Sequence, residues 1–357
     1  MRSLLLTTCP GIEDVALAET ERLIFFSHYI LKPMGIQGRL ILTLNEDPSL
    51  AAEKLNKFSR TIHRAVILLA LFNIRRDSSG LEDIYHNILK LNSLEDYLNS
   101  KVTFAVRCER LGKHEYTSID IARVAGKALQ DSFPITRRPK VNLDFPSIIF
   151  RVDVIGTSCF IGVCTTGDRS LHRRGYRIYD HPAALKSTLA AALIFLSEVS
   201  SNSLVVDPMC GGGTIPIECA FLNPNLKRII QGFDISPKHI HGAKLNALAA
   251  GVHHKISFQV ADAKKLDEIV NCNIDRIICN LPYGIRVGRK SFLKKLYSDF
   301  LFSTLKVLSS DGKITLLTTQ AKLMKNLLGE IGSLKLKCER IVGHGNLNPH
   351  IFLLEKA

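Results

Sequence analysis

The stretch that most constrains the fold is an apolar run that ends at an acid and leads into three consecutive glycines. The run covers residues 204–207, ends at Asp207, and is followed by Gly211–Gly213 and by an apolar segment that starts near Thr214. Glycine has no Cβ, so such a turn can lead sharply from a strand into a helix and let the backbone approach a ligand closely. The pattern predicts a strand–glycine turn–helix unit, which is typical of α/β folds with a parallel sheet.

A dinucleotide does not fit this turn. Its site would show the spacing G-x-G-x-x-G, with the pyrophosphate at the helix N-terminus. Here Asp207 and Glu218 flank the glycines and would repel a phosphate, whereas a cationic sulfonium and an ammonium group suit them. Asp234 ends the next predicted strand, where an acid accepts ribose hydroxyls. Asp262 ends a third and can accept from an adenine amine. Together the acids predict an adenosyl ligand.

A second feature is the sequence Asn-Leu-Pro-Tyr-Gly, which begins at Asn280 and closes another apolar run. A buried strand that ends in a tight turn shows this order. The side-chain oxygen of Asn280 and the carbonyl of Leu281 can accept the two N–H bonds of an exocyclic amine. Pro282 stiffens the turn, and Tyr283 can stack on a base. The turn therefore predicts a site for a flat base that carries an amine.

The charge balance favours a polyanionic partner. The net charge is +14, with a surplus of +3 in residues 1–165 and +11 in residues 166–357. Such a surplus binds polyanions through counterion release, and an anionic membrane surface is the competing explanation. The composition, 46% hydrophobic and 22% charged, is that of a globular protein.

Cysteine usage and hydropathy indicate the compartment. The nine cysteines include no CxxC pair, so their spacing offers neither a zinc site nor a secreted disulfide framework. No run has the apolar length of a membrane span, and the N-terminus lacks the layout of a signal peptide. We expect a soluble cytoplasmic protein without a metal.

Residues 166–186 are predicted to form a linker with an unusual cluster of charge. Four arginines and an aromatic residue surround one glycine, and Arg173, Arg174, Tyr176 and Arg177 are the candidates for RNA contact. Arginine binds phosphate through two parallel N–H bonds, and tyrosine offers a face for base stacking. The alternative is a charged surface between domains. A buried helix is predicted from residue 183 to residue 196.

The N-terminal part is predicted to hold two small domains. Residues 1–70 alternate strand, helix, strand, helix, which predicts a ferredoxin-like domain without a catalytic site. In residues 71–165, a strand over 104–110 is followed by a Gly-Lys-His turn and a helix over 118–129 with Ser118 as its N-cap. This second segment resembles the THUMP domain, an RNA-binding module of tRNA-modifying enzymes.

The THUMP resemblance implies RNA contacts from three basic residues, Arg107, Arg110 and Lys113. The alternative is a small α/β domain in which these side chains are only solvated. Residues 187–357 alternate strands and helices and finish in a strand hairpin, which is typical of the Rossmann-like methyltransferase fold.

Taken in order and spacing, the motifs resemble the THUMP-containing guanine-N2 RNA methyltransferases, and most of all those that make N2-methylguanosine at position 6 of the tRNA acceptor stem. The resemblance implies S-adenosyl-L-methionine as cofactor, tRNA as substrate and a monomer. Many relatives carry a second proline where this chain has Leu281, but leucine still contributes the backbone carbonyl.

The predicted site residues fall into three groups. The catalytic turn comprises Asn280, Leu281, Pro282 and Tyr283, and RNA contacts are assigned to Arg107, Arg110, Lys113, Arg173, Arg174, Tyr176 and Arg177. The residues assigned to the cofactor are Asp207, Pro208, Gly211, Gly213, Thr214, Glu218, Asp234, Asp262, Ala263 and Asn280.

Three other functions stay open at this point. A ribosomal RNA guanine-N2 methyltransferase would share the motifs. An adenine-N6 nucleic-acid methyltransferase uses a similar turn, although the THUMP-like segment favours RNA. A non-catalytic RNA-binding adaptor could retain the fold, but the full set of acids and the Asn280 turn argue against it.

Overall fold

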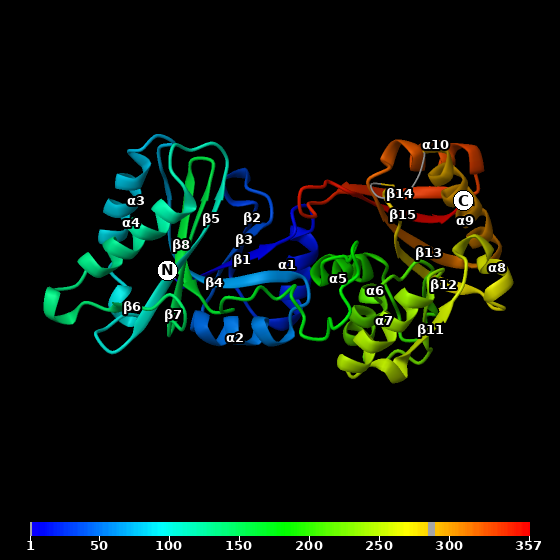
Figure 1. The fold of residues 1–357 in the computed structure, drawn as a ribbon, viewed down its shortest axis with the longest axis horizontal. Coiled ribbons are helices and arrows are strands. Elements are labelled where there is room, and N and C mark those ends of the chain that lie inside the picture. Colours follow the sequence, from blue (N-terminus) through cyan, green and yellow to red (C-terminus); the bar gives the residue numbers. More distant parts are fainter. Residues whose placement is uncertain (1, 285–289) are drawn as a thin grey trace. The chain divides into compact units, whose positions relative to one another are not determined.

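The computed structural model describes residues 2–284 and 290–357 and divides into two compact units (Figure 1). The first unit comprises the N-terminus to Thr8 together with Leu17–Leu171. The second comprises Cys9–Ala16 and His172–Ala357. Among the described residues, no helix is long and apolar enough to span a membrane.

The first unit is built on one eight-stranded sheet with the order β2-β3-β1-β4-β8-β7-β5-β6. Its strands are β1 (Ser3–Thr8), β2 (His28–Leu31), β3 (Arg39–Thr43), β4 (Ile62–Asn73), β5 (Thr103–Leu111), β6 (Lys140–Val141), β7 (Ile148–Ile155) and β8 (Ser158–Cys164). Its helices are α2 (Pro48–Phe58), α3 (Gly80–Leu89) and α4 (Ser118–Asp131), and α1 (Glu13–Leu23) contributes all but its first turn.

The predicted boundary after residue 70 lies inside strand β4. This strand pairs antiparallel with β1 on one side and with β8 on the other, so the ferredoxin-like and THUMP-like segments share a sheet. An ion pair of 3.0 Å from Arg39 on β3 to Glu109 on β5 also joins the two segments. The carboxylate of Asp153 on β7 lies 3.7 Å from the same guanidinium. The two segments therefore form one compact unit.

Helix α4 is capped one residue earlier than predicted. Thr117, not Ser118, is the N-cap: its hydroxyl accepts from the Asp120 N–H at 3.3 Å, and the Asp120 carboxylate accepts from the Thr117 N–H at 2.9 Å. This reciprocal pair is a capping box, which satisfies two backbone donors at once. If Ser118 were the N-cap, the residue three positions later would be Ile121, which has no carboxylate to accept from the cap N–H.

The second unit holds a seven-stranded sheet with the order β11-β10-β9-β12-β13-β15-β14, in which β15 runs opposite to the other six strands. Its strands are β9 (Val205–Asp207), β10 (Ile230–Asp234), β11 (Ile256–Val260), β12 (Ile274–Asn280), β13 (Leu308–Thr318), β14 (Leu334–Ile341) and β15 (His350–Lys356). Its helices are α5 (Ser187–Leu196), α6 (Thr214–Leu222), α7 (Pro237–Ala249), α8 (Leu266–Ile269), α9 (Lys290–Val307) and α10 (Ala321–Ile331).

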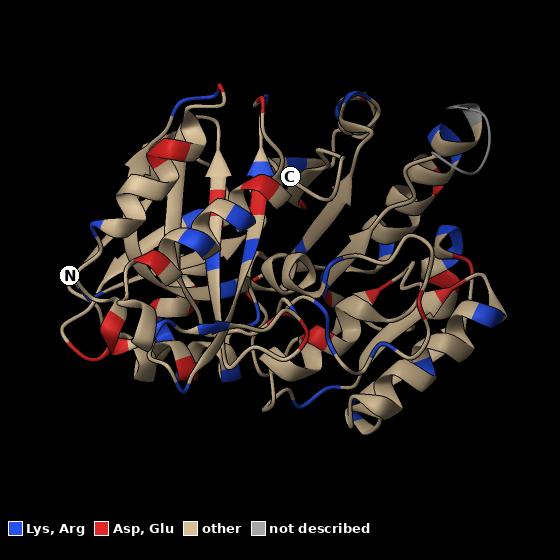
Figure 2. Ribbon diagram, turned by 60° about the vertical axis from the view of Figure 1, so that its left-hand side comes forward, with Lys and Arg blue, Asp and Glu red and all other residues tan. Residues whose placement is uncertain are grey.

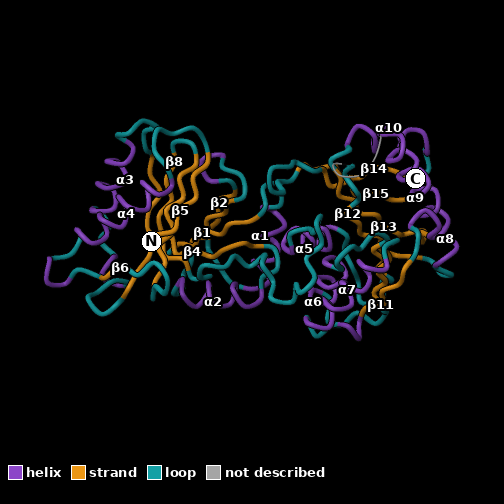
Figure 3. Tube along the Cα trace, viewed as in Figure 1, coloured by secondary structure: helices purple, strands orange, loops and turns teal. Residues whose placement is uncertain are grey.

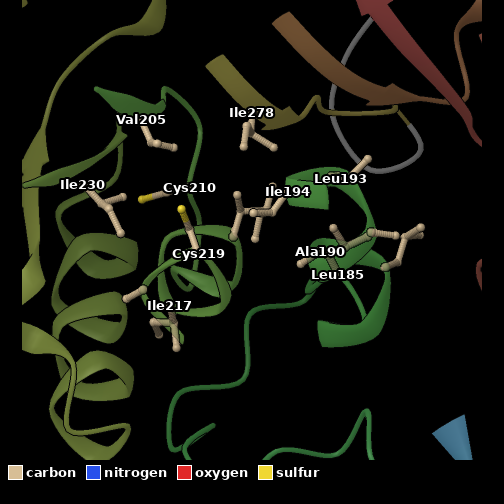
Figure 4. Close-up of a cluster of buried hydrophobic side chains, with 14 of the residues drawn as sticks. Leu185, Ala190, Leu193, Ile194, Val205, Cys210, Ile217, Cys219, Ile230 and Ile278 are labelled. Carbon is tan, nitrogen blue, oxygen red and sulfur yellow. The ribbon is translucent and has the colours of Figure 1, made fainter. Parts of the chain in front are cut away.

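Helices cover both faces of this sheet, and strands and helices alternate along the chain (Figure 3). One core includes Leu189 of α5, Ile217 of α6 and Ala243 of α7, and Figure 4 shows part of it. The other core includes Phe300 of α9 and Met324 of α10. Helix α5 begins at Ser187 rather than at residue 183, because Lys186 leaves the helical conformation (φ −59°, ψ 132°).

The segment Cys9–Ala16 belongs to the second unit, although it precedes the whole first sheet in the chain. Ile12 is fully buried in the same core as α5 and α6. The Arg340 guanidinium on β14 donates to both carboxylate oxygens of Asp14, at 2.7 Å and 3.0 Å. The segment is therefore part of the framework of the second unit, which the sequence did not predict.

We expect Gly11→Ala to destabilise the second unit. Gly11 has φ 90°, and a Cβ there would lie 2.1 Å from the Ile341 carbonyl oxygen. The matched control is Gly332→Ala, which also has a positive φ (66°) but nothing within 4 Å of the added carbon. The control should cost about 1–2 kcal/mol from backbone strain alone, and Gly11→Ala clearly more. Hydrogen exchange of the α5 and α6 amides measures both. Equal costs would show that Cys9–Ala16 does not pack against β14.

Candidate functional site

The carboxyl ends of three adjacent strands bring together three predicted site residues. Asp207 ends β9, Asp234 ends β10, and Asn280 ends β12. Strand β9 lies between the other two and is parallel to both. Parallel strands carry their carboxyl ends to the same edge of a sheet, where α/β folds bind ligands. The structure therefore places the acids and the amide at one edge.

The glycine turn between β9 and α6 is held against β10. The Gly211 N–H donates to Asp234 Oδ2 at 3.0 Å, and the Cys210 N–H donates to the Phe233 carbonyl at 2.7 Å. Gly213 has φ 79°, and a Cβ there would lie 2.9 Å from the Phe258 ring. Glycine is thus required at position 213 both for the conformation and for the close packing. Helix α6 starts directly after it, at Thr214.

Asp207 and Asp234 differ in their surroundings. Asp207 is buried and accepts from the Met209 N–H at 3.2 Å. Burial raises the pKa of the Asp207 carboxyl well above its usual range. A cationic ligand nearby would favour the ionised form of this acid. Asp234 accepts from Gly211, from the Ser236 N–H at 2.9 Å and from His239 Nδ1 at 3.2 Å, so its carboxylate is held in one orientation.

The third acid lies just beyond its strand. Asp262 follows the end of β11 by two residues, accepts from the Lys264 N–H at 3.0 Å and lies 3.2 Å from the Lys264 ammonium. Ala263 beside it is buried. Ile235, which directly follows Asp234, is not among the predicted site residues and is 69% exposed. A large apolar side chain that is exposed beside a carboxylate can cover one face of a purine ring. The sequence signal for such a residue is its position directly after the acid that ends the strand.

Glu218 requires a correction. It was predicted to face the cofactor, but its side chain is 0% exposed. The Tyr176 hydroxyl donates to Glu218 Oε1 at 2.8 Å, and Arg174 Nε lies 3.6 Å from the same oxygen. A buried carboxylate needs such partners because an unpaired charge in a core is costly. Glu218 therefore anchors the segment before α5 onto α6.

The hydrogen bond between Tyr176 and Glu218 also contradicts the prediction that Tyr176 stacks on RNA. Tyr176 is buried in the core that contains α5 and α6, so neither ring face is open to a base. Arg177 donates to the Leu185 carbonyl at 2.8 Å and to Thr214 Oγ1 at 3.2 Å. Arg173 is exposed, and of the four predicted linker contacts it is the one whose side chain lies open to solvent.

A segment that sequence reasoning missed lies over the glycine turn. Asn246 of α7 accepts from the Tyr179 N–H at 2.8 Å and donates to the carbonyls of Tyr179 at 3.0 Å and Gly212 at 2.9 Å. The His181 ring lies 3.4 Å from the position of a Cβ on Gly211 and packs edge-on against His239. In the sequence these residues only precede a helix, so no local signal placed them here.

The turn at the end of β12 is closed on itself. The Tyr283 hydroxyl donates to Asn280 Oδ1 at 2.8 Å, and the Leu281 N–H donates to the Leu317 carbonyl at 3.0 Å. The Leu281 side chain is buried, whereas Pro282 is exposed. Burial raises the pKa of the Tyr283 hydroxyl, which therefore stays protonated and donates.

The basic residues predicted in the first unit lie in different surroundings. Arg107 forms an ion pair of 2.8 Å with Asp168 and also donates to the Leu143 carbonyl at 2.8 Å. Arg110 donates to the Gly112 carbonyl at 3.2 Å. Lys113 is exposed and lines a shallow cleft whose other lining residues are Arg75, Arg76, Asp77, His114 and Glu115. Lys and Arg residues lie on both units (Figure 2).

Comparison with known proteins identifies the family. The models of the THUMP domain and of the RMKL-like methyltransferase domain match residues 78–163 and 174–349. The tRNA (guanine(6)-N2)-methyltransferase of Methanocaldococcus jannaschii is 36% identical over 98% of both chains, and that of Archaeoglobus fulgidus is 34% identical over 96% of this chain and 89% of its own. The chain belongs to the tRNA (guanine(6)-N2)-methyltransferase family.

A solved structure of a similar protein agrees with this assignment. TrmN from Thermus thermophilus, at 31% identity, covers 100% of both chains with a TM-score of 0.80. The predicted fold class, a THUMP-containing part and a Rossmann-like methyltransferase domain, is confirmed, and so are the family and its cofactor, S-adenosyl-L-methionine. The edge formed by Asp207, Asp234 and the glycine turn fits this cofactor, because an oriented carboxylate, an open apolar side chain and close backbone lie side by side.

We expect Tyr176→Phe to destabilise the second unit and to leave the affinity of this methyltransferase for tRNA unchanged. The substitution leaves the buried Glu218 carboxylate short of a donor, which costs about 1–3 kcal/mol. Tyr179→Phe is the matched control, since the hydrogen bonds of Tyr179 among the described residues are made by its backbone. Hydrogen exchange of α6 and fluorescence anisotropy with tRNA separate the two effects. A loss of tRNA affinity at unchanged stability would restore the stacking role.

Proposed function

We propose that the chain transfers a methyl group from S-adenosyl-L-methionine to the N2 amine of the guanosine at position 6 of the tRNA acceptor stem, giving N2-methylguanosine, and that it acts as a cytoplasmic monomer. The observation that carries the proposal is the Asn280 turn, which ends the strand next to the one that ends at Asp207. The names of the relatives support the tRNA substrate and its position.

The turn supplies what a guanine amine needs. The lone pair of this amine is delocalised into the ring, so the site has to orient the nitrogen and favour its developing positive charge. Asn280 Oδ1 and the Leu281 carbonyl accept its two N–H bonds, and Pro282 limits the movement of the turn. S-adenosyl-L-methionine supplies the electrophilic methyl group when bound. The new N–C bond forms as the C–S bond breaks, and the acidic cationic nitrogen gives its proton to water.

Tyr283 contacts the oxygen that the target amine would use. Its hydroxyl occupies Asn280 Oδ1 at 2.8 Å, which is the oxygen assigned to the target amine. An amide oxygen accepts two hydrogen bonds, so the target amine can bind Asn280 Oδ1 while the Tyr283 hydroxyl stays bonded to it. Flipping a base out of a stem costs a few kcal/mol, and stacking on an aromatic ring returns about 1–3 kcal/mol. Stacking on the Tyr283 ring would thus offset part of the cost of flipping the base.

The cofactor residues are proposed on the same edge of the sheet. Asp234 would accept ribose hydroxyls, Asp207 would face the cationic part, and Asp262 would accept from the adenine amine. Pro208, Gly211, Gly213, Thr214 and Ala263 would form the backbone contacts around them, and Asn280 would border the methyl group. Glu218 is no longer assigned to the cofactor, because it is buried against Tyr176.

Methyl transfer assays distinguish the proposed substrate from its rivals. A tRNA transcript with guanosine at position 6 should accept the methyl group, and a transcript with adenosine there should not. A ribosomal RNA fragment or duplex DNA accepting the group instead would favour the ribosomal or the adenine-N6 enzyme. A failure to bind S-adenosyl-L-methionine in calorimetry would favour a non-catalytic adaptor.

We expect Asn280→Ala to abolish methyl transfer while the affinity for S-adenosyl-L-methionine stays nearly intact. The substitution removes the side-chain oxygen that orients the amine and leaves Asp207 and Asp234 in place. Radiolabelled transfer to tRNA measures activity, and calorimetry measures cofactor binding. Asn223→Ala, at the end of α6, is the control and should keep full activity. Turnover by Asn280→Ala at the wild-type rate would remove the assigned role.

We expect Arg173→Ala to weaken tRNA binding and to lower the slope of log affinity against log salt by about 1, because one exposed cation no longer releases a counterion. Arg173→Lys is the control: it keeps the charge and should keep the slope. Fluorescence anisotropy across a salt series measures both variants. An unchanged slope in Arg173→Ala would show that this side chain contacts no phosphate.

A further inference from the structure

Two side chains from neighbouring elements, Tyr297 and Gln320, hold the Asn280 turn by its backbone carbonyls, and a third, Thr318, connects them. The Tyr297 hydroxyl of α9 donates to the Pro282 carbonyl at 2.7 Å. The same hydroxyl lies 2.8 Å from Thr318 Oγ1, at the end of β13. The Gln320 side-chain amide donates to the Tyr283 carbonyl at 2.8 Å, and its backbone N–H donates to Thr318 Oγ1 at 3.0 Å.

The direction of these hydrogen bonds can be assigned by counting protons. Tyr297 has one hydroxyl proton, and the Pro282 carbonyl can only accept, so this proton goes to Pro282. Thr318 must then donate to the Tyr297 oxygen, and its own oxygen accepts from the Gln320 N–H. Tyr297 and Thr318 are fully buried, and burial raises the pKa of the Tyr297 hydroxyl, so the proton stays on it. The hydroxyl of Thr318 therefore donates to Tyr297, and the hydroxyl of Tyr297 donates to the Pro282 carbonyl.

The turn needs this external support because of its composition. Proline has no N–H, so the turn cannot be held through the nitrogen of Pro282. At position 281 the leucine does have an N–H, which donates to the Leu317 carbonyl at 3.0 Å. A proline there would lack that bond. The backbone of the turn is therefore fixed at Leu281 N–H, at the Pro282 carbonyl and at the Tyr283 carbonyl.

The Leu281 carbonyl differs from the two carbonyls that follow it. Among the described residues, no hydrogen bond reaches the Leu281 carbonyl, while the next two carbonyls along the chain are both occupied. We propose that Tyr297, Thr318 and Gln320 are positioning residues that fix the turn so that the Leu281 carbonyl and Asn280 Oδ1 face the target amine together. This inference rests on the proposed methyl transfer. A displacement of about 1 Å between reacting groups can cost 100-fold in rate.

The test is Thr318→Val, which removes the middle hydroxyl and keeps the shape of the side chain. We expect kcat to fall about 10- to 100-fold, with the affinity for S-adenosyl-L-methionine and the KM for tRNA changed less than about twofold. Thr318→Ser keeps the hydroxyl and should recover most of kcat. A purely structural role would lower stability and leave kcat of the folded enzyme unchanged, which would overturn the inference.

A matched control lies on the same strand. Thr315 is also fully buried on β13, and its hydroxyl pairs with Ser197 at 2.7 Å rather than with the turn. Thr315→Val should cost similar stability and keep kcat. If Thr318→Val does not fold, Gln320→Leu removes the bond to the Tyr283 carbonyl and should also lower kcat. Absence of transfer by the wild-type enzyme would count against the proposed function, whereas an active wild type with fully active Thr318 and Gln320 variants would count against the positioning role alone.

Discussion

The parallel pairing of β9 with both β10 and β12 is the interaction on which the site depends. Gly232 pairs with Asp207 in one register, and Ile277 pairs with Val206 in the other. These registers bring two acids and an amide to one edge, although more than seventy residues separate the first from the last. Side chains at strand ends are held by the sheet itself, so little further ordering is needed when a ligand binds.

Packing partners, rather than burial, distinguish Asp207 from Glu218, since both acids are buried. Asp207 and Glu218 flank the glycines in sequence, and charge alone gave them the same role. In the structure Glu218 points into the core of the second unit, where Tyr176 donates to it, while Asp207 lies at the end of β9. A residue four positions into a helix can face either the ligand or the core. The direction depends on how the preceding segment packs, which spacing does not record.

Features that depend on residues close in sequence could be predicted, whereas features that depend on contacts between distant parts of the chain could not. Strand and helix bounds depend on local periodicity, and the strand predicted over 104–110 and the helix predicted over 118–129 lie within β5 and α4. The insertion of Cys9–Ala16 into the second unit and the sharing of β4 between two segments depend on contacts far apart in the chain. The cover over the glycine turn likewise arises from the Asn246 amide, which has no signature in sequence. The turns after Asp207 and Asn280 could be predicted from the sequence, whereas the side chains that hold these turns in place could not.

In the Asn280 turn, a backbone hydrogen bond at Leu281 restricts the chain where a proline ring could otherwise do so. A second proline would stiffen residue 281 through its ring, but it would give up a donor. Leucine keeps the donor, and the bond from Leu281 N–H to Leu317 ties the turn to β13, the strand that also carries Thr318. Fixing the carbonyls through Tyr297 and Gln320 then restricts the same torsions from the other side. Rigidity at this turn is thus a property of the packed neighbours as much as of its own residues.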